Sequence, residues 1–305
     1  MASYSADQIQ VLKGLEPVRK RPGMYVGGTD REGLHHLVWE VVGNVIDLHL
    51  AGQASELHVS VGPDAWITLR DDGPGVPTSI TSEGISMLEV VFTRLHAGAT
   101  YDGHFPHVHL TKNWRGVGLA VVNALSERLE VETTYQGIRW AQAYERGERV
   151  SPPRRIGPTT FEGTTIRFRP DPQIFGQVTL DPAAVGARLQ QLAWLNPQLR
   201  VVWQEQRLRG RGGVLGWAHS IARERGRVVC SHGVVGAEGD VKVDIGLAWN
   251  ETGPSRIHGF VNMQPTTGGT HVDGLWTAFV SMPERTTPRL ASAHAREAMA
   301  SAASP

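Results

Sequence analysis

The sequence contains a single cysteine, Cys230, so no disulfide can form within the chain. This fits a reducing compartment such as the cytosol, and a lone cysteine is more often a small core residue than a nucleophile. Neither sign of charge is in excess, because Lys+Arg and Asp+Glu both number 30 and the formal net charge is zero. The balance argues against a large non-specific surface for DNA or RNA, although it leaves a local basic patch open.

Long apolar runs are also missing, and no stretch reaches the roughly 18 residues that a membrane-spanning helix needs. The N-terminus reads MASYSADQIQVLKGL and lacks the apolar core of a signal peptide. We therefore expect a soluble, cytoplasmic protein. With 305 residues, 40% of them hydrophobic and 20% charged, the chain is long enough for two globular domains with their own cores.

Periodicity and turn residues predict a mixed α+β chain. We expect an exposed arm leading into a short helix over 1–16, turns over 18–33 and a long lid-like loop over 101–116. The expected helices cover 33–52 with Gly52 as C-cap, 84–97, 118–129, 180–197 and the second half of 266–279. The expected strands cover 56–73 with a turn at 62–64, an antiparallel sheet over 130–168, and 241–250 and 255–265. The pattern changes near 205, where we place a domain boundary, and the Ala/Ser-rich tail is expected to fray.

Four short polar motifs stand out against this background. They are Glu40-x-x-x-Asn44 in the first long helix, DDGPG (71–75) after a strand, RGVG (115–118) before a helix, and Gly163-Thr164 in a strand. Each has an ordinary structural explanation when taken alone. The first can be a buried hydrogen-bonded pair, the second a plain turn, and a glycine pair before a helix is weak evidence for phosphate binding.

Taken together, the motifs make physical sense as a nucleotide site. Gly116 and Gly118 allow the backbone to approach an anion at a helix N-terminus. Asn44 offers a neutral oxygen suited to a magnesium ion shared with phosphates. Glu40, one turn away on the same helix face as Asn44, can orient or deprotonate a water for in-line attack. Asp71, at a strand end, can accept a hydrogen bond from the exocyclic amine of adenine.

The order of these motifs resembles the ATPase region of bacterial type IIA topoisomerases, that is, the B subunits of DNA gyrase and topoisomerase IV in the GHKL superfamily. The resemblance rests on ordered blocks across residues 4–280: VLKGLEPVRKRPGMYVGGTD, GLHHLVWEVVGNVID, DDGPGVP, LHAGA, GVGLAVVNALS, EGTTIRF and FVNMQPTTGGTHVDGL. It implies a GHKL (Bergerat) α/β sandwich over 1–205, with helices on one face of a mostly antiparallel sheet. A shortened transducer-like α+β domain with a frayed tail is implied over 206–305.

The resemblance also implies roles for individual residues, with ATP and Mg²⁺ as cofactors. Glu40 would be the general base, and Asn44 would ligate magnesium. Asp71 would read the adenine amine, with Thr164 helping through a water. The pocket lining would include Asp47, Gly75, Val76 and Pro77, and the phosphates would lie against Gly116, Val117 and Gly118. Tyr4 would lie on an arm that reaches a second protomer when ATP drives dimerisation.

Several positions depart from the family pattern. Gly43 and Leu48 replace two carboxylates of the opening helix, and Pro74 and Tyr135 replace arginines at the pocket mouth. The phosphate loop reads KNWRGVG (112–118) where the family has GGLHGVG, so its first glycines and its histidine are missing. The lid lysine of the family falls near Thr100. No lysine follows Lys242, so none can be assigned to the γ-phosphate contact that the family makes from its second domain.

Three functional hypotheses remain open at this point. The first is a gyrase-B-like ATPase module with weak hydrolysis, which, having no counterpart of the cleavage and strand-passage domains, is not a complete topoisomerase. The second is a degenerate paralogue that binds and regulates gyrase B, and a third, weaker idea is a decoy for gyrase inhibitors. Three histidines in the lid-like loop, His104, His107 and His109, allow a metal site, but exposed lid residues are the simpler explanation.

Overall fold

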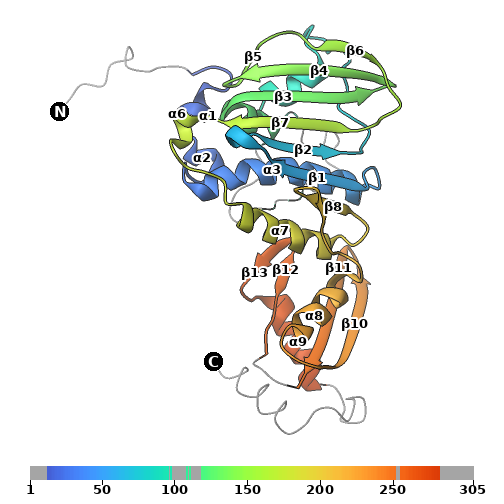
Figure 1. Cartoon of the computed structure of the whole chain (residues 1–305). Helices are drawn as coiled ribbons and strands as arrows, with labels where there is room; N and C mark the ends of the chain where they lie inside the picture. The colour runs from blue at the N-terminus through green and yellow to red at the C-terminus, as the bar shows by residue number, and fades with distance from the viewer. Residues whose placement is uncertain are drawn as a thin grey trace, which may run out of the picture.

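The computed structural model describes residues 12–95, 97, 108, 110, 118–251 and 255–281. A large sheet with its helices forms one part, and a smaller part contains α8, α9 and β10 to β13 (Figure 1). Within the part of the chain that the structure describes, no helix has the length and apolar character to cross a membrane.

The large part is built on a nine-stranded sheet in the order β5-β4-β3-β7-β2-β1-β8-β9, with β6 paired to β4. Every pairing is antiparallel except that of β1 with β8. The strands are β1 (Glu56–Val61), β2 (Ile67–Asp71), β3 (Ser126–Tyr135), β4 (Ile138–Glu145), β5 (Glu148–Arg149), β6 (Arg154–Pro158), β7 (Thr164–Pro170), β8 (Arg200–Trp203) and β9 (Gln206–Arg207). The mostly antiparallel sheet expected from the sequence is confirmed.

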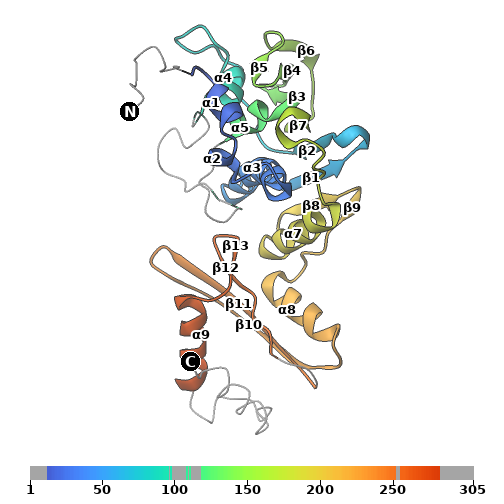
Figure 2. The same ribbon diagram turned by 90° about the vertical axis from the view of Figure 1, so that its left-hand side faces the viewer.

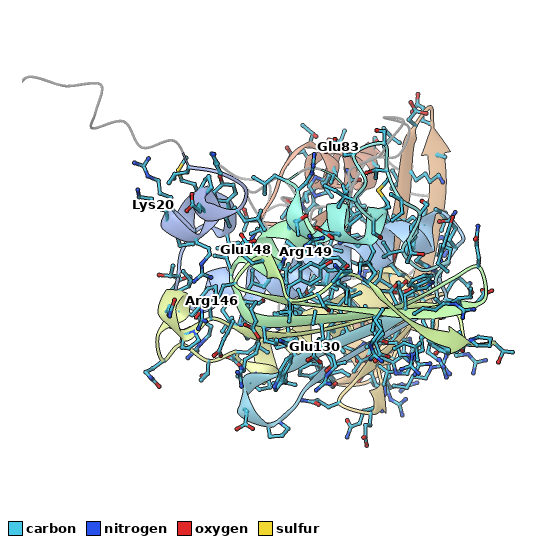
Figure 3. The ribbon with its side chains drawn as sticks, turned by 90° about the horizontal axis from the view of Figure 1, so that it is seen from above. Lys20, Glu83, Glu130, Arg146, Glu148 and Arg149 are labelled. Carbon is cyan, nitrogen blue, oxygen red and sulfur yellow. The ribbon has the colours of Figure 1, made fainter. Side chains whose placement is uncertain are left out.

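Helices cover one face of this sheet, as Figure 2 shows for α1, α3, α4 and α5. The helices of this part are α1 (Glu16–Lys20), α2 (Gly23–Val26), α3 (Arg31–Leu50), α4 (Met87–Thr93), α5 (Leu119–Ala124), α6 (Pro172–Phe175) and α7 (Pro182–Leu195). Alternate residues of the central strands, such as Leu69, Val131 and Phe168, point into the core beneath them and are buried. The opposite face is charged: in Figure 3, Glu130 lies on the far side of the sheet from Arg149, which pairs with Glu89 of α4.

The long helix α3 positions much of the site. Asp30 caps its start, because the Asp30 carboxylate accepts a hydrogen bond from the Gly33 amide at 3.1 Å. It ends at Leu50, and Gly52 follows with φ +73°, the left-handed conformation that glycine supplies after a helix. The helix predicted over 33–52 is therefore confirmed, with its start two residues earlier.

Two local expectations in the sheet part need correction. The helix predicted over 118–129 ends at Ala124, and the chain turns directly into β3, whose Leu129 and Val131 alternate into the core. Because β3 pairs with β4 on one side and β7 on the other, residues from Ser126 onward form a strand although their apolar spacing also suits a helix. The segment 18–33, predicted as turns, contains most of α1 and all of α2, because Pro17 and Pro22 start these short helices.

The smaller part contains two hairpins and two helices. Its strands are β10 (Val228–Glu238) paired with β11 (Val241–Asn250), and β12 (Gly259–Val261) paired with β13 (Gln264–Thr266). Its helices are α8 (Gly213–Arg223) and α9 (Thr270–Ser281). The strand expected over 241–250 is confirmed. The single strand expected over 255–265 is wrong, because left-handed Asn262 and Met263 turn the chain into the hairpin of β12 and β13. No sequence pattern predicted α8 in its basic, glycine-punctuated segment. Cys230 on β10 is only partly buried.

Candidate nucleotide site

In each of three neighbouring strands, the buried apolar residues give way to a buried polar residue at the same end of the sheet. On the helix-covered face, Leu69 of β2 is followed two residues later by Asp71, Val131 of β3 by Thr133, and Ile166 of β7 is preceded by Thr164. Thr133 and Thr164 are register partners across β3 and β7. Because β7 lies between β2 and β3, the three polar side chains gather at one end of the sheet. Such a polar patch inside a core calls for a polar ligand or for mutual hydrogen bonds.

Asp71 is the electrostatically least favourable member of this group. Its side chain is 8% exposed, and its Oδ1 accepts hydrogen bonds from the Gly73 amide at 2.8 Å and the Thr164 amide at 3.3 Å. Burial nevertheless outweighs these bonds and raises the pKa of Asp71 to about 6. A buried carboxylate with a raised pKa is a typical feature of functional sites.

The neighbouring Asp72 makes hydrogen bonds to a different segment, the start of β1. Its carboxylate accepts hydrogen bonds from the Ser55 amide, the Ser55 hydroxyl and the Glu56 amide. These bonds hold the start of β1 and keep the pKa of Asp72 below its usual value in spite of the opposing effect of burial. Only the first aspartate of DDGPG therefore faces the core.

The segment after Asp71 runs along the end of β3. The Val76 amide donates a hydrogen bond to the Thr133 hydroxyl at 2.7 Å. Gly75 has φ +76°, and a Cβ there would lie 1.8 Å from the Thr134 carbonyl oxygen, so only glycine fits. Pro74 and Pro77 are exposed, while Gly75 and Val76 are half-buried. The predicted lining residues Gly75, Val76 and Pro77 thus form one edge beside Asp71 and Thr164.

Glu40 is held on two sides inside the fold. Its side chain is 6% exposed; its Oε1 lies 2.9 Å from Nε2 of His36, and its Oε2 accepts a hydrogen bond from the Gly118 amide at 2.9 Å. The motifs did not predict His36 as part of the site. The signal was present in the sequence, since His36 precedes Glu40 by four residues and so lies on the same helix face.

The other two polar residues of α3 follow on the same face as Glu40. The Asn44 amide nitrogen donates to the Glu40 carbonyl at 2.9 Å, which turns the Asn44 amide oxygen away from the helix backbone as an acceptor. Asp47 accepts a hydrogen bond from the Val108 amide at 2.8 Å. A neutral amide oxygen is a suitable single protein ligand for a magnesium ion that phosphates and waters also coordinate, so Asn44 fits the predicted metal role.

The predicted phosphate-binding residues are only partly within the described residues. Gly118 has φ +80° and is the N-cap of α5, in line with a glycine turn that leads into a helix. Gly116 and Val117, the rest of the altered loop (112–115), Thr100, Tyr4 and the three lid histidines lie outside the described residues. Within the described ranges, no group of three or more His, Cys, Asp or Glu side chains is arranged to hold a metal ion.

Known families match both parts of the chain. The family of histidine kinase-, DNA gyrase B-, and HSP90-like ATPases matches residues 29–174, and the DNA gyrase B family matches residues 217–289. The chain is 40% identical over 301 residues to the DNA gyrase B protein of Thermotoga maritima, covering 92% of this chain and 46% of that protein. It is 38% identical to the Thermus thermophilus counterpart, covering 91% and 45%. The chain thus spans about half the length of these relatives.

A solved structure extends the similarity to the fold. The 43K ATPase domain of Thermus thermophilus gyrase B, solved in complex with an aminocoumarin, superimposes with a TM-score of 0.74 at 33% identity. The match covers 91% of this chain and 77% of that domain. The GHKL fold expected from the sequence motifs is confirmed by this likeness. The chain therefore belongs to the gyrase B family of GHKL ATPase domains.

Proposed function

We propose that this gyrase-B-like ATPase module binds ATP with Mg²⁺ and hydrolyses it slowly, with Glu40 as the general base. The observation that carries the proposal is the placement of Glu40, buried between the His36 ring and the Gly118 amide. These two contacts fix the orientation of the Glu40 carboxylate, and a carboxylate held in this way is suited to take a proton from a water. We also propose a domain boundary near residue 205, with a nucleotide-binding part at 1–205.

The adenine end of the pocket is assigned to Asp71. Both of its bonds from the described residues go to Oδ1, which leaves Oδ2 to accept from an exocyclic amine. Above its pKa of about 6 Asp71 is an acceptor only, so it favours adenine over bases that carry a carbonyl at the same position. Gly75, Val76, Pro77 and Asp47 line the pocket around it.

The phosphate end is assigned to the start of α5 and to α3. We assign phosphate binding to Gly116, Val117 and Gly118. The Gly118 amide donates to Glu40, so Gly118 contributes the turn of the backbone through its φ of +80°, and phosphate oxygens are assigned to the backbone amides of the two residues before it. Asn44 supplies one oxygen ligand to magnesium, which when bound neutralises phosphate charge. Slow turnover follows from the altered residues 112–115, which lack the family's first glycines and histidine.

Calorimetric titration with a non-hydrolysable ATP analogue and Mg²⁺ tests the binding half of the proposal. We expect saturable binding with one site per chain, and no binding would end the ATPase proposal. Phosphate release by the wild type and by Glu40→Ala tests the catalytic half. A general base contributes about 10²–10⁴-fold, so we expect the variant to fall to background while its affinity for the analogue is kept.

A second candidate is a regulatory or inhibitor-binding paralogue that keeps the fold without turnover. The altered residues 112–115 favour it, and equal background phosphate release by wild type and Glu40→Ala would select it. Capture of gyrase-directed inhibitors is less favoured, because Pro74 and Tyr135 stand where the family has arginines at the pocket mouth.

We further propose that nucleotide drives pairing of two chains, or of this chain with a full-length gyrase B protein. Light scattering of the chain with the analogue and Mg²⁺ is expected to give twice the monomer mass. A monomer mass at saturating analogue would contradict the homodimer, and the same measurement with added gyrase B then tests the mixed pair.

A further inference from the structure

Thr133 lies outside all of the sequence motifs, yet it connects both sides of the adenine end of the pocket. It is 1% exposed on β3, directly opposite Thr164 of β7. Its hydroxyl oxygen accepts from the Val76 amide at 2.7 Å and lies 3.2 Å from the Thr164 hydroxyl oxygen. A chain of hydrogen bonds therefore runs from Val76 through Thr133 to Thr164, whose amide in turn donates to Asp71.

The direction of the hydroxyl–hydroxyl bond follows from counting donors. Among the described residues, Thr133 Oγ1 has only Val76 and Thr164 as partners, and the Val76 amide can only donate. The buried Thr133 proton is satisfied only if it is donated to Thr164. Thr164 then accepts from Thr133, and its own proton must be donated elsewhere.

We propose that Thr133 is a specificity-determining positioning residue, which fixes the Thr164 hydroxyl as a donor toward the N1 position of the purine. The inference rests on the proposed nucleotide function and deepens it. Adenine offers an exocyclic amine as donor and N1 as acceptor, and ionised Asp71 with a donating Thr164 matches this pair. A water between Thr164 and N1 preserves the polarity, because it accepts from Thr164 and donates onward.

Bases with the opposite polarity are rejected by the same arrangement. Hypoxanthine and guanine carry a carbonyl at C6 and a proton on N1. The carbonyl faces an acceptor in Asp71, and the N1 proton faces a donor in Thr164. Unpaired polar groups in a buried site are the strongest source of discrimination between ligands of similar size. Without the Thr133 proton, the Thr164 hydroxyl can rotate and present a lone pair to N1–H.

The test compares three diphosphates, which have no γ-phosphate to hydrolyse: ADP, IDP and 1-deaza-ADP, in which a C–H replaces N1. Affinities are measured by calorimetry at pH 7.5, where Asp71 is ionised. In the wild type, replacing N1 is expected to weaken binding about fivefold to tenfold, the usual range for one hydrogen bond. In Thr133→Val the Thr164 hydroxyl can still donate to N1, so this loss is expected to persist, whereas the preference for ADP over IDP is expected to fall about tenfold.

Two further variants isolate the hydroxyl. Thr133→Ser keeps the donor and is expected to keep both ratios at their wild-type values. Thr134→Val makes the same chemical change one residue further on, on the opposite face of the strand, and is expected to leave both ratios at wild-type values. A purely structural role for Thr133 would lower affinity for all three ligands equally and leave the ratios unchanged.

Failure of the wild type to bind ADP would overturn both the proposed function and the role of Thr133. Binding by the wild type with an unchanged preference for ADP over IDP in Thr133→Val would overturn the role of Thr133 alone. If the valine variant does not fold, the same ratios are measured in Thr133→Ala, which also lacks the hydroxyl and leaves only a small cavity.

Discussion

Asp71 lowers the stability of the fold at neutral pH, because burial raises the pKa of its carboxyl. Its folded pKa of about 6 lies above the ordinary value of 3.8, so the folded state binds its proton more tightly than the unfolded state. The protonated form therefore adds stability below pH 3.8, and this stability is lost as the pH rises through about 6. At pH 7.5 the full cost of the buried charge, about 3 kcal/mol, is present.

We therefore expect Asp71→Asn to raise the free energy of unfolding at pH 7.5 by up to about 3 kcal/mol. The gain should disappear near pH 4. The same variant should lose nucleotide binding, and the wild type should lose it as the pH falls through about 6, because the protonated carboxyl no longer acts only as an acceptor. Chemical denaturation across pH 4–8, with calorimetry, measures both. An Asn variant less stable than the wild type at pH 7.5 would refute this account.

Gly75 allows a matched comparison with a second glycine. Gly75 and Gly137 have almost the same backbone conformation, with φ +76° and +71°, but a Cβ at Gly137 meets nothing within 4 Å while one at Gly75 meets the Thr134 carbonyl. Gly137→Ala should cost only the left-handed strain, about 1–2 kcal/mol. Gly75→Ala should cost roughly 3 kcal/mol or more, since the backbone must move. Thermal melting of both variants measures the difference. Equal losses of stability would show that the backbone at 73–77 can move away from the Thr134 carbonyl at little cost.

Residues whose chemistry is visible from spacing alone could be predicted from the sequence. Glu40, Asn44 and Asp47 share a helix face, and Asp71 ends a strand, so these placements could be predicted. Thr133 was not, because its role comes from register pairing between β3 and β7, which connects residues 31 positions apart. His36 was within reach of the helix rule, but a histidine in an apolar helix is usually a satisfied core residue.

At the scale of elements, Arg19 joins three segments that are far apart in sequence. Its guanidinium on α1 donates to the Ala124 carbonyl at the end of α5 and to the Asp171 carboxylate after β7, both at 2.7 Å. Asp171 is fully buried and also accepts from Arg146 at 3.0 Å; Figure 3 shows Arg146 at this end of the sheet. The start of α5, at Gly118, holds Glu40, so Arg19 supports the site from the other end of the same helix.

We expect Arg19→Ala to cost about 2–4 kcal/mol of unfolding free energy, because it leaves a buried carboxylate with less compensation and a helix end without its donor. Arg139→Ala is the matched control. Arg139 pairs with Glu132 on the exposed face, where an ion pair contributes at most about 1 kcal/mol. Urea denaturation of both variants measures the two costs, and similar small losses would mean that Arg146 alone satisfies Asp171.

Competition between two periodicities explains why one helix boundary was predicted wrongly. GLAVVNALSERL has helical spacing of apolar residues, but Leu129 and Val131 also alternate as a strand does, and the sequence alone does not choose between the two periods. The choice is made by β4 and β7, which flank β3 on both sides. The helices over 33–52 and 180–197 were predictable because capping residues mark their starts, namely Asp30 and Asp181.

At the scale of the whole molecule, α7 is the element through which the sheet part meets the hairpin β12–β13. The turn of that hairpin has two left-handed residues, Asn262 at φ 45° and Met263 at φ 71°, as a two-residue turn of this kind requires. It presents the Met263 carbonyl to Arg188 of α7, at 2.6 Å from Nη2, while Nη1 donates to Gln191. Burial lowers the pKa of Arg188 to about 10, so the guanidinium stays charged at neutral pH.

Within the described residues Arg188 has no carboxylate partner, so its partly buried charge is compensated by a carbonyl and an amide oxygen. A charged donor bonded to a neutral acceptor contributes more than a neutral pair, about 1.5–3 kcal/mol. That energy is available only while the hairpin is docked on α7. The contact therefore stabilises the docking of the hairpin on α7; below it is called the Arg188 latch. No local pattern in the sequence indicates it, because it joins residues 75 positions apart.

We expect Arg188→Ala to remove the Arg188 latch, so that the hairpin β12–β13 undocks from α7 more often while the sheet part stays folded. Amide hydrogen exchange over β12 and β13 should accelerate about tenfold or more, which corresponds to at least about 1.4 kcal/mol of lost docking energy, while exchange over β2, β3 and β7 stays at wild-type rates. Arg188→Lys should give an intermediate value, because it keeps the charge and loses the planar fork. Arg207→Ala, on the exposed edge strand β9, is the control and should change neither region. Faster exchange spread evenly over both parts would show that Arg188 supports the core of α7 rather than the docking of the hairpin.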